Sequence, residues 1–238
     1  MLEGKLANAG LIKKIIESIK ELVDEATFDC SRTAISLQAM DSSHVAMVSL
    51  KLKASLFETY RCDRNINLGL SLANMSKALK CANNDDKCIF KYTEKDGDAI
   101  VFTFANQKQD KTQDVTVKMM DIDSEHLDVP DQEYSVVFNS NSIVFTCKGD
   151  IGSSVVTYSA SSSTDDEKEA VSLEVKEPVN VNFSIKYMNQ FTKATSLGDR
   201  VRLSLRNDVP VVVEYPIEDN GFLKFYLAPK IDDDDFMD

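Results

Sequence analysis

The chain has 238 residues, a length that favours two domains of roughly 100 residues each. Its composition, 43% hydrophobic and 28% charged, is that of a globular protein, and no apolar run is long enough to span a bilayer. The net charge of −12 excludes a general affinity for nucleic acid, although cations could still be gathered on one surface. The first residues lack the basic and apolar regions of a secretory signal, so we do not expect secretion.

The sequence contains none of the common motifs of an enzyme. No P-loop, dinucleotide-binding, zinc-protease or serine-hydrolase motif occurs. The five cysteines form no C-x-x-C pair, so we expect free, mostly buried thiols in a reducing compartment. His44 and His126 have no partner at metal-ligand spacing, which predicts no zinc site and no cofactor. Cys62 as a catalytic nucleophile would need a base, and no partner for it is obvious.

The first 120 residues alternate between helical and strand patterns. We expect a strand over 2–7, helices over 9–23 and 71–82, and strands over 45–52, 87–93, 98–105 and 113–120. From residue 27 to residue 71 the apolar residues recur with period two, which is typical of strands. The first helix is predicted by apolar residues at helical spacing: Ile12, Ile15, Ile16, Ile19, Leu22 and Val23.

An acidic segment over 121–133 separates this region from the rest of the chain. It has six acidic residues and no Lys or Arg, and Pro130 and the missing periodicity predict an extended linker. We reject a metal or acid–base site here because no fixed scaffold orients the carboxylates. Beyond it we expect strands over 134–138, 143–147, 153–159, 170–175, 179–185, 200–205, 210–215 and 222–227, with one helix over 186–194. The aspartates from 232 form an acidic tail.

The chain repeats itself at an offset of 113 residues. Ser71 then aligns with Ser184, and the strand at Lys87 aligns with the one at Arg200, which predicts two similar domains. Ser71 follows 70 residues of the first half, but Ser184 lies only 50 residues after Tyr134. About 20 residues of the second half are therefore missing, including any counterpart of the helix over 9–23.

Positive charge gathers in three helical windows. The windows 5–20, 71–82 and 184–195 carry +3, +2 and +2, so the remaining chain carries −19. Lys13 and Lys20, like Lys186 and Lys193, are seven residues apart and therefore share a helix face. A solvated lysine face is ordinary for one helix, but three such helices predict a positive surface that holds a polyanion without reading its sequence.

Several long runs of residues give the sequence a resemblance to the eukaryotic DNA sliding clamps. The resemblance covers nearly the whole chain, and the runs that carry it are 36–45, 59–65, 118–123, 191–195, 209–215 and 226–231. The resemblance implies an α+β fold of two similar clamp-type domains, with antiparallel sheets outside and helices lining the central channel of a trimeric ring. It implies an N-terminal clamp domain over 1–120, an interdomain connector loop over 121–133, a shortened C-terminal clamp domain over 134–230 and an acidic tail over 231–238.

The resemblance also implies a function in the nucleus. Such a protein is a processivity factor for the replicative DNA polymerase: it encircles duplex DNA, is handled by a clamp loader, and docks replication and repair proteins. The lysines that match the channel-lining positions of the family are Lys5, Lys13, Lys14, Lys20, Lys77, Lys80, Lys186 and Lys193.

Clients of the family insert a peptide, the PIP-type motif, that carries a glutamine, an aliphatic residue and two aromatic residues. The resemblance places their pocket beneath the connector loop, whereas the sequence alone would assign its residues to an ordinary core. The matching positions are Met40, His44, Val45, Leu127, Val129, Pro130, Pro210, Tyr226, Ala228 and Pro229.

Subunits of the family join edge strand to edge strand, here about 110–118 against 153–160. The family pattern continues after Tyr134–Val137 into a helix and two strands, which this chain lacks. We expect sheet residues such as Val144, Val155 and Val156 to lose the cover of that helix. The alternative to a clamp is a monomeric module that binds client peptides but cannot close a ring.

Overall fold

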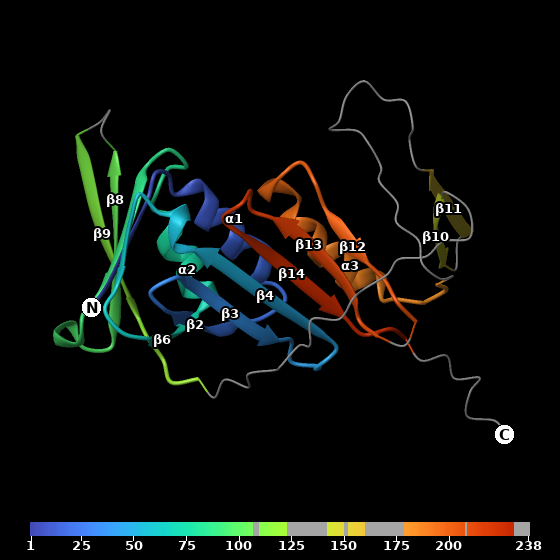
Figure 1. Ribbon diagram of the computed structural model, residues 1–238, viewed down its shortest axis with the longest axis horizontal. Helices are drawn as coiled ribbons and strands as arrows, with labels where there is room; N and C mark the ends of the chain where they lie inside the picture. The colour runs from blue at the N-terminus through green and yellow to red at the C-terminus, as the bar shows by residue number, and fades with distance from the viewer. Residues whose placement is uncertain (107–109, 123–141, 150–151, 160–178, 208, 231–238) are drawn as a thin grey trace.

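The computed structural model describes residues 1–106, 110–122, 142–149, 152–159, 179–207 and 209–230. The strands of the described residues form a five-stranded sheet, a seven-stranded sheet and a separate two-stranded hairpin, all antiparallel. Three α-helices lie side by side across the molecule, with α1 between the other two (Figure 1). This arrangement agrees with the predicted α+β class.

The elements of the first half follow the predicted order. They are β1 (Leu2–Leu6), α1 (Gly10–Ile19), β2 (Glu25–Cys30), β3 (Ala34–Met40), β4 (Ala46–Lys53), β5 (Thr59–Cys62), β6 (Ile66–Ser71), α2 (Leu72–Leu79), β7 (Lys87–Tyr92), β8 (Ala99–Asn106) and β9 (Lys111–Lys118). Single 3-10 turns lie at Ala54–Leu56 and Glu94–Asp96.

The second half has fewer described elements. They are β10 (Ser142–Gly149), β11 (Gly152–Ser159), α3 (Ile185–Phe191), the 3-10 helix η3 (Thr192–Leu197), β12 (Arg202–Ser204), β13 (Val211–Pro216) and β14 (Gly221–Leu227). The strands predicted over 134–138 and 170–175 lie outside the described residues.

The seven-stranded sheet joins the two halves of the chain. Its order is β12-β13-β14-β4-β3-β2-β6, so β14 from the second half pairs with β4 from the first. The five-stranded sheet, with order β5-β1-β7-β8-β9, belongs to the first half alone. We call the face of the seven-stranded sheet that the helices cover its inner face, and the opposite face its outer face.

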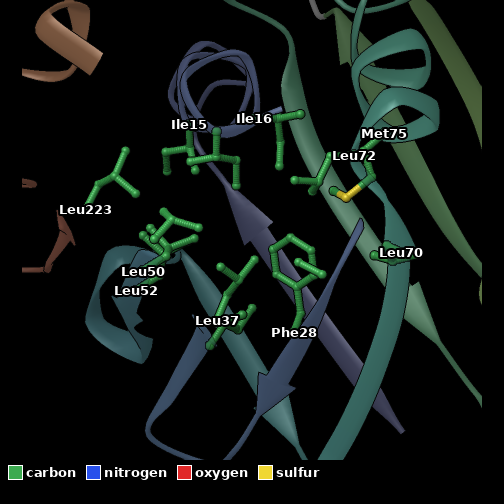
Figure 2. Packing of buried hydrophobic residues seen from close by; sticks show 14 of the residues in the cluster. Ile15, Ile16, Phe28, Leu37, Leu50, Leu52, Leu70, Leu72, Met75 and Leu223 are labelled. Carbon is green, nitrogen blue, oxygen red and sulfur yellow. The ribbon is translucent and has the colours of Figure 1, made fainter. Parts of the chain in front are cut away.

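The core lies between the helices and the two large sheets, and residues of both sheets belong to one buried cluster. Ile15 and Ile16 of α1 point toward Leu37 and Leu50 of the sheet (Figure 2). On the second half, Phe191 at the end of α3 stacks on Phe225 of β14 at a ring distance of 4.6 Å. Burial of these side chains, each contributing about 1.5–3 kcal/mol, fixes the helices on one face of the sheet.

The predicted helix over 9–23 is too long at its C-terminal end. The α-helix ends at Ile19, and the carbonyl of Ile19 accepts from the backbone N–H groups of Leu22 and Val23 at 3.0 and 3.1 Å. Leu22 and Val23 are buried in this turn, so they keep the apolar spacing of the helix without belonging to it. The chain must turn here because β2 begins at Glu25.

The repeat offset of 113 residues is seen in the helices. Helix α2 begins at Leu72 and α3 at Ile185, with Ser71 and Ser184 as their N-cap residues. The Ser71 hydroxyl accepts from the Asn74 N–H at 3.4 Å, whereas Ser184 makes no such side-chain bond. Each helix is followed by three antiparallel strands, β7-β8-β9 and β12-β13-β14.

The strand predicted over 179–185 is wrong. Residues 179–184 form no strand in the described structure, and α3 already begins at Ile185. The repeat aligns this segment with β6, which is held by its ladder to β2. The second half lacks a described counterpart of β2, and an alternating pattern becomes a strand only when a partner completes its ladder.

The hairpin of β10 and β11 exposes apolar side chains, as predicted for a sheet that lacks its helix. Val144, Val155 and Val156 are 52%, 62% and 44% exposed, and Tyr158 is 50% exposed. Phe145 and Tyr158 pack edge to face at 6.0 Å across the two strands. In Figure 1 the hairpin stands apart from the two large sheets.

Gly69 of β6 allows the segment that follows β9 to pass directly against the sheet. The Met120 N–H donates to the Gly69 carbonyl at 2.9 Å, and a Cβ on Gly69 would lie 2.1 Å from the Met120 carbonyl oxygen. Gly69→Ala should therefore displace residues 119–122 and destabilise the protein by roughly 1–3 kcal/mol in chemical denaturation. Gly198→Ala is the matched control, since the nearest atom to its added Cβ is 3.5 Å away. Equal unfolding midpoints for the two variants would contradict this account.

Candidate functional site

The predicted channel lysines gather on the row of helices. Seven of the eight lie on α1, α2, α3 or the residues that directly follow them, whereas Lys5 lies on β1. Helix α1 contacts both α2 and the α3–η3 segment, so the lysines of both halves lie on neighbouring helices (Figure 1). The structure thus brings the three positive windows of the sequence together.

Four of these lysines are engaged by neighbouring groups. Their partners are the Glu58 carboxylate for Lys5 at 2.9 Å, the Ala82 carbonyl for Lys13 at 2.8 Å, the Glu17 carboxylate for Lys20 at 2.6 Å and the Glu21 carboxylate for Lys193 at 3.7 Å. The carboxylates that pair with Lys5, Lys20 and Lys193 reduce the net charge that these lysines present to a ligand, whereas the neutral Ala82 carbonyl only orients the ammonium group of Lys13.

The other four, Lys14, Lys77, Lys80 and Lys186, are exposed. None of them forms an ion pair with any residue in the part of the chain that the structure describes. Their ammonium groups are therefore the ones best placed to meet an external polyanion.

Lys20 belongs to a small polar network that joins α1 to α2. Glu17 accepts from the Ser76 hydroxyl at 2.6 Å through one oxygen and pairs with Lys20 through the other. Burial acts to raise the pKa of Glu17, but the hydrogen bonds from Lys20 and Ser76 outweigh it and lower the pKa. Lys20 thus helps to hold two helices together as well as adding charge.

The described members of the predicted client pocket meet at one end of the outer face. Met40 pairs with Met47 across β3 and β4, and Met47 pairs with Tyr226 across β4 and β14. Leu37 and Phe225 point inward, so the alternation of strand residues puts Met40, Met47 and Tyr226 on the outer face. Met40 and Tyr226 are partly exposed, whereas Met47 between them is buried. We call the surface formed by Met40, Tyr226 and the chain ends beside them, with Met47 beneath it, the client patch.

The chain ends beside this row carry further predicted residues. In the ladder, Val211 pairs with Leu227 and Leu227 pairs with Ala46. Pro210, Ala228 and Val45 are the immediate neighbours of these residues, so they lie at the same end of the sheet. The Ala228 N–H donates to the Val45 carbonyl at 3.0 Å, and Pro229 follows directly.

The loop between β3 and β4 brings His44 and Val45 to this end. His44 is exposed and has a φ of 55°, and Val45 is 37% exposed. Leu127, Val129 and Pro130 lie outside the described residues. Met47 was not among the predicted residues, because only the cross-strand register shows that it stands between Met40 and Tyr226.

Asp41 organises the loop that precedes β4. One carboxylate oxygen accepts from the N–H groups of Val45 and Ala46 at 2.8 and 2.7 Å, and the other accepts from the Ser43 N–H at 3.1 Å and the Tyr187 hydroxyl at 2.7 Å. Burial acts to raise the pKa of Asp41, but these hydrogen bonds outweigh it and lower the pKa. Asp41 therefore stays ionised and holds the loop.

Of the residues considered for catalysis or metal binding, Cys62 and His44 are described, whereas His126 and the acidic residues from 123 to 133 lie outside the described structure. Among the described residues, no group of three or more His, Cys, Asp or Glu side chains could hold a metal ion. Cys62 is buried, its thiol donates to the Arg64 carbonyl at 2.8 Å, and burial raises its pKa. A raised pKa lowers the thiolate fraction, so Cys62 is a poor nucleophile. Cys30 and Cys88 are also buried, whereas Cys81 and Cys147 are exposed thiols.

The described helices include none that is long and apolar enough to cross a membrane. Among the described strands, β9 and β11 each lie at an edge of their sheet. Strand β9 ends the five-stranded sheet, and β11 is one of only two strands in the described hairpin. These are the edges over 110–118 and 153–160 that the resemblance assigns to the subunit contact.

Comparison with known proteins agrees with this geometry. Residues 1–127 match the model of the N-terminal domain of proliferating cell nuclear antigen, and residues 109–230 match that of its C-terminal domain. The chain is 72% identical to the proliferating cell nuclear antigen of Caenorhabditis elegans over 263 aligned positions that cover 100% of both chains. These 263 positions exceed the 238 residues of the chain by 25, which is close to the shortfall of about 20 that the repeat predicts.

The antiparallel sheets, the row of basic helices and these matches define a DNA sliding clamp, not an enzyme. The chain belongs to the proliferating cell nuclear antigen family. It is a nuclear processivity factor that forms a homotrimer around duplex DNA, binds the clamp loader, and docks polymerase and other replication and repair proteins that carry a PIP-type peptide. The monomeric alternative is not favoured.

Proposed function

We propose that the clamp uses the two faces of its seven-stranded sheet for two different ligands. The helices on the inner face hold DNA through their lysines, and the client patch on the outer face holds the peptide of a client. One observation carries this proposal: the basic helices cover the inner face of one continuous sheet, and the row Met40, Met47 and Tyr226 lies on its outer face.

DNA binding is assigned to the lysines of the helix row. Lys14, Lys77, Lys80 and Lys186 supply most of the attraction because they have no carboxylate partner among the described residues. Lys5, Lys20 and Lys193 contribute less because each is paired with a carboxylate, and Lys13 contributes less because its ammonium group donates to the Ala82 carbonyl. Because ammonium groups meet phosphates, the association is independent of sequence and falls steeply with salt.

Client binding is assigned to the patch together with the connector loop over 121–133, which supplies Leu127, Val129 and Pro130. The described part of the patch combines apolar side chains with the exposed residues His44 and Val45. Such a surface suits aromatic anchors that are buried beside a few polar contacts. In this proposal the domains extend over 1–120 and 134–230, with an acidic tail over 231–238.

The ring is assigned to the open edges of β9 and β11. Within the chain, β14 pairs antiparallel with β4 and thereby joins the last strand of one half to the first half. The repeat makes β9 the counterpart of β14, and β11, like β4, is the second strand of a hairpin. The same kind of contact between β9 of one subunit and β11 of the next would link subunits head to tail, and a closed series gives a ring.

Tyr226→Ala tests the client patch. Removal of this ring should weaken a peptide with the glutamine, aliphatic and aromatic pattern by about 30-fold in calorimetry, which corresponds to roughly 2 kcal/mol for a hot-spot contact. Leu127→Ala should act in the same direction. Tyr92→Ala, on β7 of the other sheet, is the control and should leave the dissociation constant unchanged. An unchanged dissociation constant for Tyr226→Ala would refute the assignment.

A further inference from the structure

We propose that Tyr187 of α3 is a positioning residue for client binding. Its hydroxyl holds the loop over 41–45 in the conformation that presents His44 and Val45, and it does so through Asp41 without touching the client. This inference rests on the client patch proposed above.

The loop over 41–45 is built around the Asp41 carboxylate. Besides its bonds to the N–H groups of Ser43, Val45 and Ala46, the backbone carbonyl of Asp41 accepts from the His44 N–H at 3.0 Å. His44 has a positive φ of 55°, a conformation that a residue other than glycine keeps only when its surroundings enforce it. The orientation of Asp41 therefore decides the conformation of the whole loop.

Tyr187 fixes that orientation from the other half of the chain. Its hydroxyl donates to the Asp41 carboxylate at 2.7 Å, and its ring is partly buried against the core. The bond to Asp41 is the largest cause that raises the pKa of Tyr187, so the hydroxyl keeps its proton and donates. Because packing holds the ring in place, the hydroxyl offers the carboxylate a donor at a fixed position.

The loop passes this restraint on to the patch. The Val45 carbonyl accepts from the Ala228 N–H, so a shift of Val45 also shifts the segment that follows β14. A continuous chain of contacts thus runs from α3 through Asp41 and Val45 to Ala228. Without the tyrosine hydroxyl, Asp41 keeps its three backbone donors, so the fold persists while the carboxylate and the loop gain freedom.

Tyr187→Phe tests the inference because it removes the hydroxyl and keeps the ring. With the full-length trimer and the same client peptide, calorimetry should show about tenfold weaker binding, and hydrogen exchange at the Val45 and Ala46 amides should become faster. Tyr60→Phe is the matched control, since the Tyr60 hydroxyl donates to the Ser31 carbonyl, also at 2.7 Å, and Tyr60 lies on β5 of the five-stranded sheet. The control should change neither the peptide affinity nor the exchange of these two amides.

The outcomes separate this inference from the proposal on which it rests. If Tyr226→Ala weakens the peptide and Tyr187→Phe does not, the positioning role is wrong and the patch stands. If Tyr226→Ala has no effect, both are wrong. Weaker binding of Tyr187→Phe with unchanged exchange at Val45 and Ala46, or with loss of the trimeric mass, would also overturn the positioning role, because the effect would not act through the loop.

Discussion

A clamp with Lys14, Lys77 and Lys80 reversed to glutamate should hold DNA at least about 100-fold less tightly at physiological salt, with its fold intact. All three lysines are exposed, and their reversal breaks no ion pair among the described residues. Lys80 acts on Glu17 only through its charge, which helps to lower the pKa of that carboxyl. Each phosphate contact that is lost should also reduce the slope of log K against log salt by about one. Retention on circular DNA, measured over a series of salt concentrations, checks both effects.

The control for this variant carries the same change of charge elsewhere. Lys51, Lys53 and Lys95 are exposed on other elements of the first half, and their reversal to glutamate should leave retention nearly unchanged. Lys20 is unsuitable for this test because it pairs with Glu17 in the network with Ser76. Its reversal would place two carboxylates together and loosen α1 from α2, so a loss of DNA binding would be mixed with a loss of stability. Equal retention of the triple variant and the control would refute the assignment of the channel.

The second half should open far more readily than the first. Amides of β10 and β11 should exchange at least about 100-fold faster than those of β3 and β4, which corresponds to roughly 3 kcal/mol of local stability. In the first half, α1 covers the sheet with Ile15, Ile16 and Ile19, all fully buried. A helix of this kind contributes on the order of 10 kcal/mol of gross burial, and part of that gain is offset by the entropy of ordering its residues.

Hydrogen exchange resolved by residue checks this expectation. Strands β7 and β8 serve as a second reference besides β3 and β4, since they form a hairpin within a covered sheet and their Phe90 and Phe102 are buried. The mass of the assembly is measured on the same sample, because β11 carries one of the proposed ring contacts. Equal protection in both halves together with a trimeric mass would show that the shortened half is stabilised by other contacts.

The sequence predicts the helices and most strands because their apolar periodicity is local. It fails where an element depends on a distant partner. Residues 179–184 alternate like a strand, yet the ladder that would make them one is not formed in the described structure. Leu22 and Val23 continue the helical spacing of α1 but are buried in a turn.

The site shows the same division. The charge of the three helical windows is a property of the sequence, and the structure places those helices side by side. The pairing of Lys5 with Glu58, or of Lys193 with Glu21, depends on residues far apart along the chain. Met40 and Tyr226 look like ordinary core residues in the sequence, so only the family resemblance singled them out. Met47 could not be predicted from the sequence, because a cross-strand row exists only once the register is known.

The pairing of β4 with β14 has a consequence for the order of events during synthesis. Leu52 of β4 pairs with Gly221, so one side of β4 stays open until nearly the whole chain has left the ribosome. During that interval the edge of β4 is an unpaired template that another nascent chain could join. Contacts so distant in sequence also slow folding, because the loop between them must close first. We therefore expect nascent clamp chains to need protection from aggregation until residues 221–227 emerge.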